Sequence, residues 1–361
     1  MKKILFITIR NPFSGKFSGD VIRSKKFIQF FNKKNHVDVI SIDKNTDEQV
    51  VKKIKYFSFK DINFLYKFFN IFLSMLKLKP MQLGYFYSPK IKKFVEENSE
   101  KYDLFFFQTI RAAQYIPKNT IKRSVLDMGD LYSRNYNQMC KQLFFLNPLK
   151  IIYLIESLLI RKYENFCFNK FNKILLFSKK EINSINKSFK KKLLQVNFGI
   201  DKIKKKYKFN RKNYKIVFIG NIRYTPNQQA CYQFINKILP KIIAKYPEIQ
   251  FHIIGEISII DKLILEKKSN VKVFGKVKNL TPFLNKTICG MANLDVSSGI
   301  QTKILTYMSY GIPTVCSYQV AKSFDAIKKS KVNFYKNEKE MLKLIFKFKE
   351  NKKFSLSASN R

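Results

Sequence analysis

Short apolar runs alternate with longer amphipathic segments along this chain of 361 residues. The alternation is typical of parallel sheets covered by helices, because strands that are buried on both faces are apolar throughout. A charged stretch without apolar periodicity, residues 199–213, separates the runs into two sets. The expected strands are Lys3–Thr8, Val37–Ile42, Leu104–Gln108, Arg123–Leu126, Ile174–Phe177 and Leu193–Asn197 before this stretch, and Lys215–Ile219, Gln250–Ile254, Val271–Phe274, Ile288–Ala292 and Pro313–Cys316 after it.

We therefore expect two Rossmann-like, doubly wound α/β domains of about equal size that face a central cleft. The first would comprise residues 1–198 and the second residues 214–348, with residues 199–213 as the linker. From residue 349 onward the chain is polar and then rich in Ser and Asn, so we expect residues 349–361 to form a frayed tail.

The chain carries a formal net charge of +45, from 70 Lys and Arg residues against 25 Asp and Glu residues. Only nine of these 70 residues are Arg, whereas base reading in nucleic acids favours the bidentate Arg fork. We therefore expect no nucleic-acid partner. The charge instead indicates acidic partners, such as phosphorylated substrates or an anionic membrane surface.

The five cysteines are scattered and never form a C-x-x-C pair, which indicates a reducing compartment and neither a disulfide framework nor a metal site. The first apolar run is too short for a signal-peptide core, and no stretch reaches the roughly 20 apolar residues of a spanning helix. We expect a cytoplasmic protein, either free or peripheral on the cytoplasmic face of the inner membrane.

Several kinds of chemistry are poorly supported by the residues. The only two histidines, His36 and His252, adjoin or lie in expected strands, which argues against triad hydrolases, Cys-His enzymes and H-E-x-x-H metalloenzymes. The chain has no G-x-x-x-x-G-K-[ST], G-x-G-x-x-G or Asp-x-Asp motif. We therefore expect neither a cofactor nor a metal, and a phosphorylated ligand held by helix N-termini, Lys and Arg.

Two segments of the second half match that requirement, GIQTKILTYMSYGIPTV at 299–315 and FIGNIRYTPNQQA at 218–230. Each places glycine and polar residues where a strand leads into a helix, although an ordinary strand–loop–helix connection would look similar. The expected ligand-facing residues are Gly299, Gln301, Thr302 and Lys303 in the first segment and Gly220, Asn221, Arg223 and Asn227 in the second.

A third candidate segment follows the first strand. Gly15, Gly19 and Asp20 lie in its loop and Arg23 lies in the first turn of the next helix, with Arg111 assigned to the same group. These residues would contact a ligand, and the alternative is an ordinary strand-to-helix loop; the assignment as an acceptor-side or diphosphate loop comes only from the family resemblance given below.

Four carboxylates of the first half are further candidates. Asp127 and Asp130 follow a buried strand, where they would hydrogen-bond sugar hydroxyls or cap the next helix. Both are candidate catalytic residues. Glu156 and Glu164, eight residues apart, are expected on a solvated or interdomain face of one helix.

Residues 62–79, INFLYKFFNIFLSMLKLK, carry apolar side chains along one broad stripe with lysines around it. Such a segment forms either a basic aromatic helix that lies in a lipid interface or a core helix of the first domain.

Taken together, the motifs resemble those of the retaining, nucleotide-sugar-dependent glycosyltransferases of the GT-B fold, specifically the "family 4" group that builds bacterial surface glycans. GIQTKILTYMSYGIPTV is similar to that group's G-I-Q-N-K-x-L-E-A-M-A-x-G-x-P-V-V, and FIGNIRYTPNQQA to its F-x-G-x-M-x-Y-x-P-N-x-x-A. LDMGDLYS, IESLLIRKYE and LLFSKKEI match a subgroup pattern in the same order.

The resemblance implies a UDP-, GDP- or other nucleotide-sugar donor that is held mainly by the second domain. Lys303, Gly299 and the Gly220 loop would face its phosphates and nucleoside, and Ile300 and Thr306 belong to the same motif. It also implies an acceptor near the Gly15–Arg23 loop, no metal, and retention of configuration with the leaving diphosphate assisting the incoming hydroxyl.

The implied function is transfer of a hexosyl-type sugar to a lipid-linked glycan. Two residues depart from the family pattern. Thr306 stands where the family has a ribose-binding Glu, which would lower donor affinity by about 1–3 kcal/mol. Asn221 stands where many members have a basic residue. These departures favour the alternative, a catalytically inert GT-B protein that acts as a binding or scaffold subunit in glycan assembly.

Overall fold

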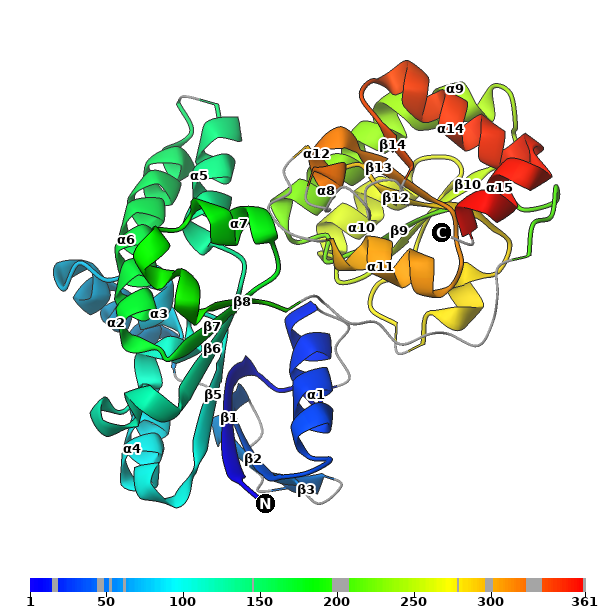
Figure 1. Ribbon diagram of the computed structural model, residues 1–361. Helices are drawn as coiled ribbons and strands as arrows, with labels where there is room; N and C mark the ends of the chain where they lie inside the picture. The colour runs from blue at the N-terminus through cyan, green and yellow to red at the C-terminus, as the bar shows by residue number, and fades with distance from the viewer. Residues whose placement is uncertain are drawn as a thin grey trace. The chain divides into compact units, whose positions relative to one another are not determined.

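The computed structural model divides the chain into two compact units, which Figure 1 shows as two sheets with their covering helices. Unit one comprises Met1–Lys16 and Asp20–Asn197, and unit two comprises Phe17–Gly19 and Phe198–Arg361. The structure describes residues 1–14, 19–43, 49–51, 54–60, 63–144, 146–196, 208–277, 279–295, 301–322 and 333–359. Of the expected linker, residues 199–207 therefore lie outside the described residues.

Within the described residues, the sheet of unit one has eight strands in the order β3-β4-β2-β1-β5-β6-β7-β8, and only β3 pairs antiparallel. Its strands are β1 Lys3–Arg10, β2 His36–Asp43, β3 Gln49–Val51, β4 Ile54–Lys60, β5 Leu104–Gln108, β6 Ser124–Gly129, β7 Lys173–Leu176 and β8 Leu193–Gln195. All six strands expected in this half are confirmed. The edge strand β3 and its neighbour β4 were not expected. Strand β4 mixes polar and apolar residues instead of forming a continuous apolar run.

Helices cover both faces of this sheet. They are α1 Gly19–Phe31, α2 Phe64–Leu76, α3 Met81–Tyr85, α4 Pro89–Glu97, α5 Tyr132–Gln142, α6 Pro148–Lys170 and α7 Lys179–Ser184. Ile4, Phe6 and Phe106 pack with Ile28 of α1, whereas alternate residues such as Leu5 pack in the core with α4 and α6. Figure 1 shows α1 on one side of the sheet and α4 and α6 on the other.

In the part of unit two that the structure describes, the sheet has six parallel strands in the order β11-β10-β9-β12-β13-β14. They are β9 Lys215–Ile219, β10 Gln250–Ile254, β11 Val271–Val273, β12 Thr287–Ala292, β13 Thr314–Ser317 and β14 Asn333–Tyr335. The five strands expected in this half are confirmed, and β14 is an additional edge strand. The helices are α8 Thr225–Gln233, α9 Leu239–Ile243, α10 Ile259–Glu266, α11 Thr302–Ser309, α12 Tyr318–Ala321, α14 Glu338–Glu350 and α15 Lys352–Ser359.

The expected frayed tail at 349–361 is wrong for the residues that the structure describes. Helix α14 continues to Glu350 and α15 follows at once. The Ser355 hydroxyl donates to the Phe348 carbonyl at 2.8 Å, and the Phe354 ring lies 5.1 Å from the Phe348 ring. The second α/β domain therefore extends past residue 348, because Phe348 and Phe354 bury apolar area that composition alone does not reveal.

None of the helices that the described residues form combines the length and the apolar character needed to cross a membrane.

Candidate functional site

In each unit, the candidate residues lie where parallel strands end, at the edge where α/β sheets bind ligands. In unit two they follow β9 and surround the start of α11. In unit one they follow β1, β5 and β6. Gly15, Gly299 and Ile300 lie outside the described residues.

Lys303 connects two of the predicted segments of unit two. Its side chain lies in the first turn of α11 and is only 6% exposed. Nζ donates to Asn227 Oδ1 at 2.7 Å and lies 3.9 Å from the centre of the Phe218 ring. Asn227 Nδ2 donates in turn to the Asn221 carbonyl at 2.8 Å. Three predicted residues, Lys303, Asn227 and Asn221, therefore form one hydrogen-bonded cluster.

The charge of Lys303 is destabilised by its surroundings. Burial lowers the pKa of its ammonium to about 7, because an ammonium loses hydration in an apolar site. Among the described residues no carboxylate pairs with Nζ. Among the described residues, the site therefore contains a buried ammonium without a paired anion. It lies at the N-terminus of a helix whose dipole also favours negative charge.

The loop after β9 is fixed by backbone contacts. Gly220 N donates to the Ile254 carbonyl at 3.0 Å, and Gly255 has a φ of +146°. A Cβ on Gly255 would lie 1.8 Å from the Gly220 oxygen, so only glycine allows the two loops to meet. Sequence reasoning missed Gly255, although a glycine directly after an expected strand was a usable signal. Arg223 lies exposed in this loop, with Glu256 as its ion-pair partner at 3.9 Å.

The remaining predicted residues of unit two lie along α11. Gln301 is the N-cap residue and Thr302 begins the helix. The Thr306 hydroxyl donates to the Thr302 carbonyl at 3.0 Å, so its proton is used within the helix. Tyr307, which was not predicted, accepts from Ile219 N at 2.8 Å and thereby ties α11 to the end of β9. An aromatic residue at helical spacing carries no sequence signal for that role beyond core packing.

In unit one, Arg23 and Asp127 form a buried bidentate ion pair. Arg23 Nε lies 2.6 Å from Asp127 Oδ2, and Nη2 lies 2.7 Å from Oδ1. The guanidinium also lies 4.7 Å from the Phe27 ring centre and 4.3 Å from that of Phe177. Burial raises the pKa of the Asp127 carboxyl, and the hydrogen bonds and charge of Arg23 act against that increase. The two groups satisfy each other within the fold, and a ligand-binding role for either stays a prediction.

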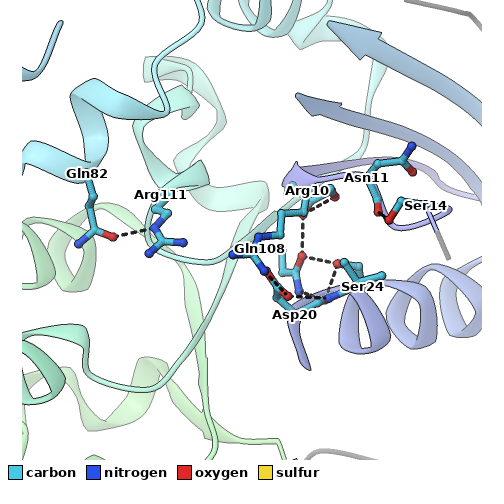
Figure 2. Close-up of polar contacts among 10 residues, drawn as sticks. Arg10, Asn11, Ser14, Asp20, Ser24, Gln82, Gln108 and Arg111 are labelled. Atoms are coloured by element: carbon cyan, nitrogen blue, oxygen red, sulfur yellow. Dashed lines mark hydrogen bonds and ion pairs between the residues drawn. The ribbon is translucent and has the colours of Figure 1, made fainter. Parts of the chain in front are cut away.

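A second polar network joins the ends of β1 and β5 to the start of α1 (Figure 2). Arg10 Nη1 donates to Asp20 Oδ1 at 3.2 Å, and Gln108 Nε2 donates to the Asp20 carbonyl at 2.8 Å. The Ser24 hydroxyl donates to Gln108 Oε1. Arg10 and Gln108 were not predicted, although both end apolar strands. Gly19, which was predicted, begins α1.

Arg111 lies apart from this network, on the segment that follows β5. Its Nε donates to Gln82 Oε1 at 2.7 Å, and its guanidinium lies 4.8 Å from the Phe86 ring centre (Figure 2). Arg111 is therefore held against α3 through Gln82.

Asp130 directly follows β6 and has a shielded oxygen, Oδ1, without a hydrogen-bond partner among the described residues. Glu181 of α7 has such an oxygen as well, Oε2. Burial, and then the negative charge of Glu181, raise the pKa of Asp130 well above its usual range, and burial raises the pKa of Glu181 to about 7. A protonated carboxyl of this kind can donate a hydrogen bond to a hydroxyl oxygen. Sequence reasoning included Glu181 only as part of a motif.

The expected solvated face for Glu156 and Glu164 is wrong, because both side chains are buried. Glu156 accepts from Met81 N at 2.7 Å and Gln82 N at 3.1 Å, and so caps α3. Glu164 accepts from the Ser133 backbone N–H at 3.0 Å at the start of α5. Buried N–H groups at helix starts need such partners, which accounts for both carboxylates.

Within the apolar segment 62–79, Phe64–Leu76 form α2, and Ile62 lies outside the described residues. The core-helix alternative is wrong. Asn70 is its only buried residue. More than half of each of several apolar side chains is exposed, namely Phe64, Leu65, Phe68, Phe69, Phe72 and Leu76.

The chain is similar to known proteins in part of its sequence and in its fold. Residues 213–343 match the family model of the glycosyl transferases group 1. HepE of Anabaena, solved with UDP-glucose, is 13% identical with a TM-score of 0.65, and the match covers 100% of this chain and 93% of that one. TarM of S. aureus is 10% identical with a TM-score of 0.66, covering 99% and 94%. WaaG, a glycosyltransferase involved in lipopolysaccharide biosynthesis, is 11% identical with a TM-score of 0.67, covering 99% and 93%.

No curated protein sequence matches the chain. At identities this low, the structural similarity establishes the fold alone. The fold is GT-B, with two parallel-sheet domains.

Proposed function

We propose that this chain, whose fold is GT-B and whose residues 213–343 match the family model of the glycosyl transferases group 1, is a glycosyltransferase that binds a nucleotide-sugar donor at the Lys303 cluster of unit two. The sugar would pass to a hydroxyl of a glycan acceptor. The observation that carries this proposal is the buried ammonium of Lys303 at the start of α11, which has Asn227 and, among the described residues, no carboxylate beside it.

The donor's diphosphate would supply the missing negative charge. Near a diphosphate the protonated form of Lys303 is favoured, and the N-terminus of α11 adds its partial positive charge. These groups would stabilise the charge that develops on the departing nucleoside diphosphate. Catalysis would thus rest on electrostatics that are in place before the reaction starts.

We further propose retention of configuration without a protein nucleophile. The bond from the anomeric carbon to the diphosphate oxygen breaks while the acceptor oxygen bonds to the same face. The acceptor's proton passes to the departing diphosphate oxygen. Asp127 is engaged by Arg23, so Asp130, with its unpartnered oxygen, is the better candidate to hydrogen-bond an acceptor hydroxyl.

Metal and cofactor independence belong to the same proposal. The sequence has no Asp-x-Asp motif, and within the described ranges no three His, Cys, Asp or Glu side chains gather in a way that could hold a metal ion. Transfer that persists in EDTA would support this point, and transfer that needs an added divalent ion would contradict it.

We place the acceptor at a membrane, as a lipid-linked glycan on its cytoplasmic face. The support is α2, whose exposed phenylalanines and leucines would enter a lipid interface while the positive charge of the chain attracts anionic lipids.

One observation favours a second candidate function. The Thr306 hydroxyl donates its proton to the Thr302 carbonyl, so this position offers the ribose no carboxylate. A chain that binds its donor too weakly for turnover would act as a binding or scaffold subunit in glycan assembly.

A thermal-shift panel with UDP, GDP, ADP, CMP and their sugar conjugates at fixed salt tests the donor proposal. A ligand at about 100 times its dissociation constant stabilises the folded protein by roughly 2.7 kcal/mol. We expect one nucleotide diphosphate and its conjugates to raise the melting temperature, Lys303→Met to abolish the shift, and Lys339→Met, at an exposed position of α14, to preserve it. A folded protein that responds to none of these ligands would contradict donor binding.

A further inference from the structure

Unit one contains a cavity that none of the candidate site residues lines. We call it the α2–α6 pocket, because it is lined by α2 and its C-terminal loop, α3, α4 and α6, together with the segment after Arg111. Its volume is about 550 Å³, within the range of small-molecule sites.

The lining of the α2–α6 pocket is basic and contains no Asp or Glu. Four lysines contribute to it: Lys77 and Lys79 after α2, Lys92 of α4 and Lys162 of α6. Lys92 pairs with Glu96 at 2.9 Å. The other three have no ion-pair partner among the described residues, so the pocket concentrates uncompensated positive charge.

Two buried polar groups in the lining lack hydrogen-bond partners among the described residues. They are Nδ2 of Asn70 and the hydroxyl of Tyr163, on side chains that are 7% and 8% exposed. A buried donor without a partner destabilises the folded state, so native proteins seldom keep one without a compensating role. Both groups can donate to a phosphate oxygen.

The helices around the pocket are held together by close contacts. A Cβ on Gly84 would lie 2.2 Å from the Asn70 carbonyl oxygen, so α2 and α3 touch backbone to backbone. Glu156 fixes α3 to α6 through its hydrogen bond from Met81 N. Figure 1 shows α2 and α3 beside α6 in unit one.

Exposed apolar side chains adjoin the opening. Leu73 lines the pocket, and its neighbours on the surface of the helix, Phe69 and Leu76, are more than half exposed. These surfaces fit a ligand that combines an anionic headgroup with an apolar tail. The headgroup would occupy the basic pocket, and the tail would lie on the exposed apolar surface of α2.

We propose that the α2–α6 pocket binds the phosphate-bearing headgroup of an anionic membrane lipid, with the acyl chains along Phe69, Phe72 and Leu76. This inference rests on the proposal that the enzyme works at a membrane surface. It does not depend on the donor site in unit two. The pocket would hold the enzyme at one orientation on anionic bilayers.

Flotation of the full chain with vesicles tests this site. We expect binding to vesicles of phosphatidylcholine with phosphatidylglycerol and little binding to phosphatidylcholine alone. Ser74→Trp fills the pocket without a change of charge and should weaken binding at least tenfold, whereas Ser74→Ala should leave it unchanged. Tyr163→Phe, which removes only the unpartnered hydroxyl, should weaken binding without lowering the melting temperature.

Competition separates a lipid site from a small-anion site. Short-chain phosphatidylglycerol should displace the protein from vesicles at concentrations at which inorganic phosphate does not. Equal competition by inorganic phosphate, vesicle binding by Ser74→Trp at wild-type strength, or equal binding to neutral vesicles would each overturn the proposal. A donor-induced thermal shift that Ser74→Trp retains shows that the variant is folded and that the donor proposal stands apart from this result.

Discussion

The buried ammonium of Lys303 makes donor binding depend on pH in a direction that can be worked out. Its pKa is about 7 in the free protein, because burial opposes the charge. A diphosphate beside Nζ favours the charged form, so binding above pH 7 requires uptake of a proton. Affinity should therefore fall as the pH rises above 7, by up to tenfold, or about 1.36 kcal/mol, per pH unit.

Calorimetry in buffers of different ionisation enthalpy measures this uptake directly. With a pKa of about 7, Lys303 is roughly nine-tenths neutral at pH 8 and one-tenth neutral at pH 6. We expect about 0.9 proton to be taken up per bound nucleotide sugar at pH 8 and about 0.1 at pH 6. A nucleotide sugar is the suitable ligand, because its diphosphate has no titrating oxygen in this range.

Lys303→Met should bind the nucleotide sugar weakly and without this uptake. A wild-type protein that binds at pH 8 with no proton taken up would refute the reasoning. The same shift predicts the stability of the free protein. Between about pH 7 and 10.5 the unfolded chain binds one proton more than the folded chain, so the contribution of Lys303 to the free energy of unfolding rises with pH there.

Three further substitutions test other parts of the structure. Asp127→Asn should lower the free energy of unfolding by about 3–5 kcal/mol, because Arg23 stays buried without its partner. The control Glu97→Gln, which breaks an exposed ion pair, should lower it by less than about 1 kcal/mol. Urea unfolding measures both losses, and losses of similar size would contradict this account. Tyr307→Phe should cost about 1–3 kcal/mol in the same assay, because Ile219 N–H loses its acceptor, and an unchanged midpoint would count against it. Thr306→Glu should raise donor affinity at least fivefold by calorimetry, and a weaker complex would argue against the assigned ribose position.

Much of the fold could be predicted from the sequence, because parallel strands that are buried on both faces consist of continuous runs of apolar residues. Leu104–Gln108 and Lys215–Ile219 were expected to the residue. The edge strands Gln49–Val51 and Asn333–Tyr335 were not expected, whereas the equally short edge strands Leu193–Gln195 and Val271–Val273 were, so strand length alone does not account for the difference.

The site was predicted less completely, for a physical reason. Lys303, Asn227 and Asn221 were predicted as site residues from their motifs and their loop positions, and the structure joins them in one hydrogen-bonded cluster. Sequence cannot show which polar residues are already paired within the fold. Arg23 and Asp127 lie 104 residues apart, and their mutual ion pair became visible only through tertiary structure.

Exposure was equally hard to predict, because it depends on which neighbour covers a helix face. The phenylalanines of α2 are as apolar as those of the core, yet no described element covers Phe68 or Phe72.

The central claim is transfer of a sugar from a nucleotide donor, and the most direct test measures that transfer. The full chain would be incubated with the nucleotide sugar that binds in the thermal-shift panel and with a glycolipid extract from bacterial inner membranes. We predict release of nucleoside diphosphate that requires the extract, accompanies sugar incorporation, persists in EDTA and disappears in Lys303→Met. Binding of the donor without release or incorporation would contradict the claim and favour the role of a binding subunit.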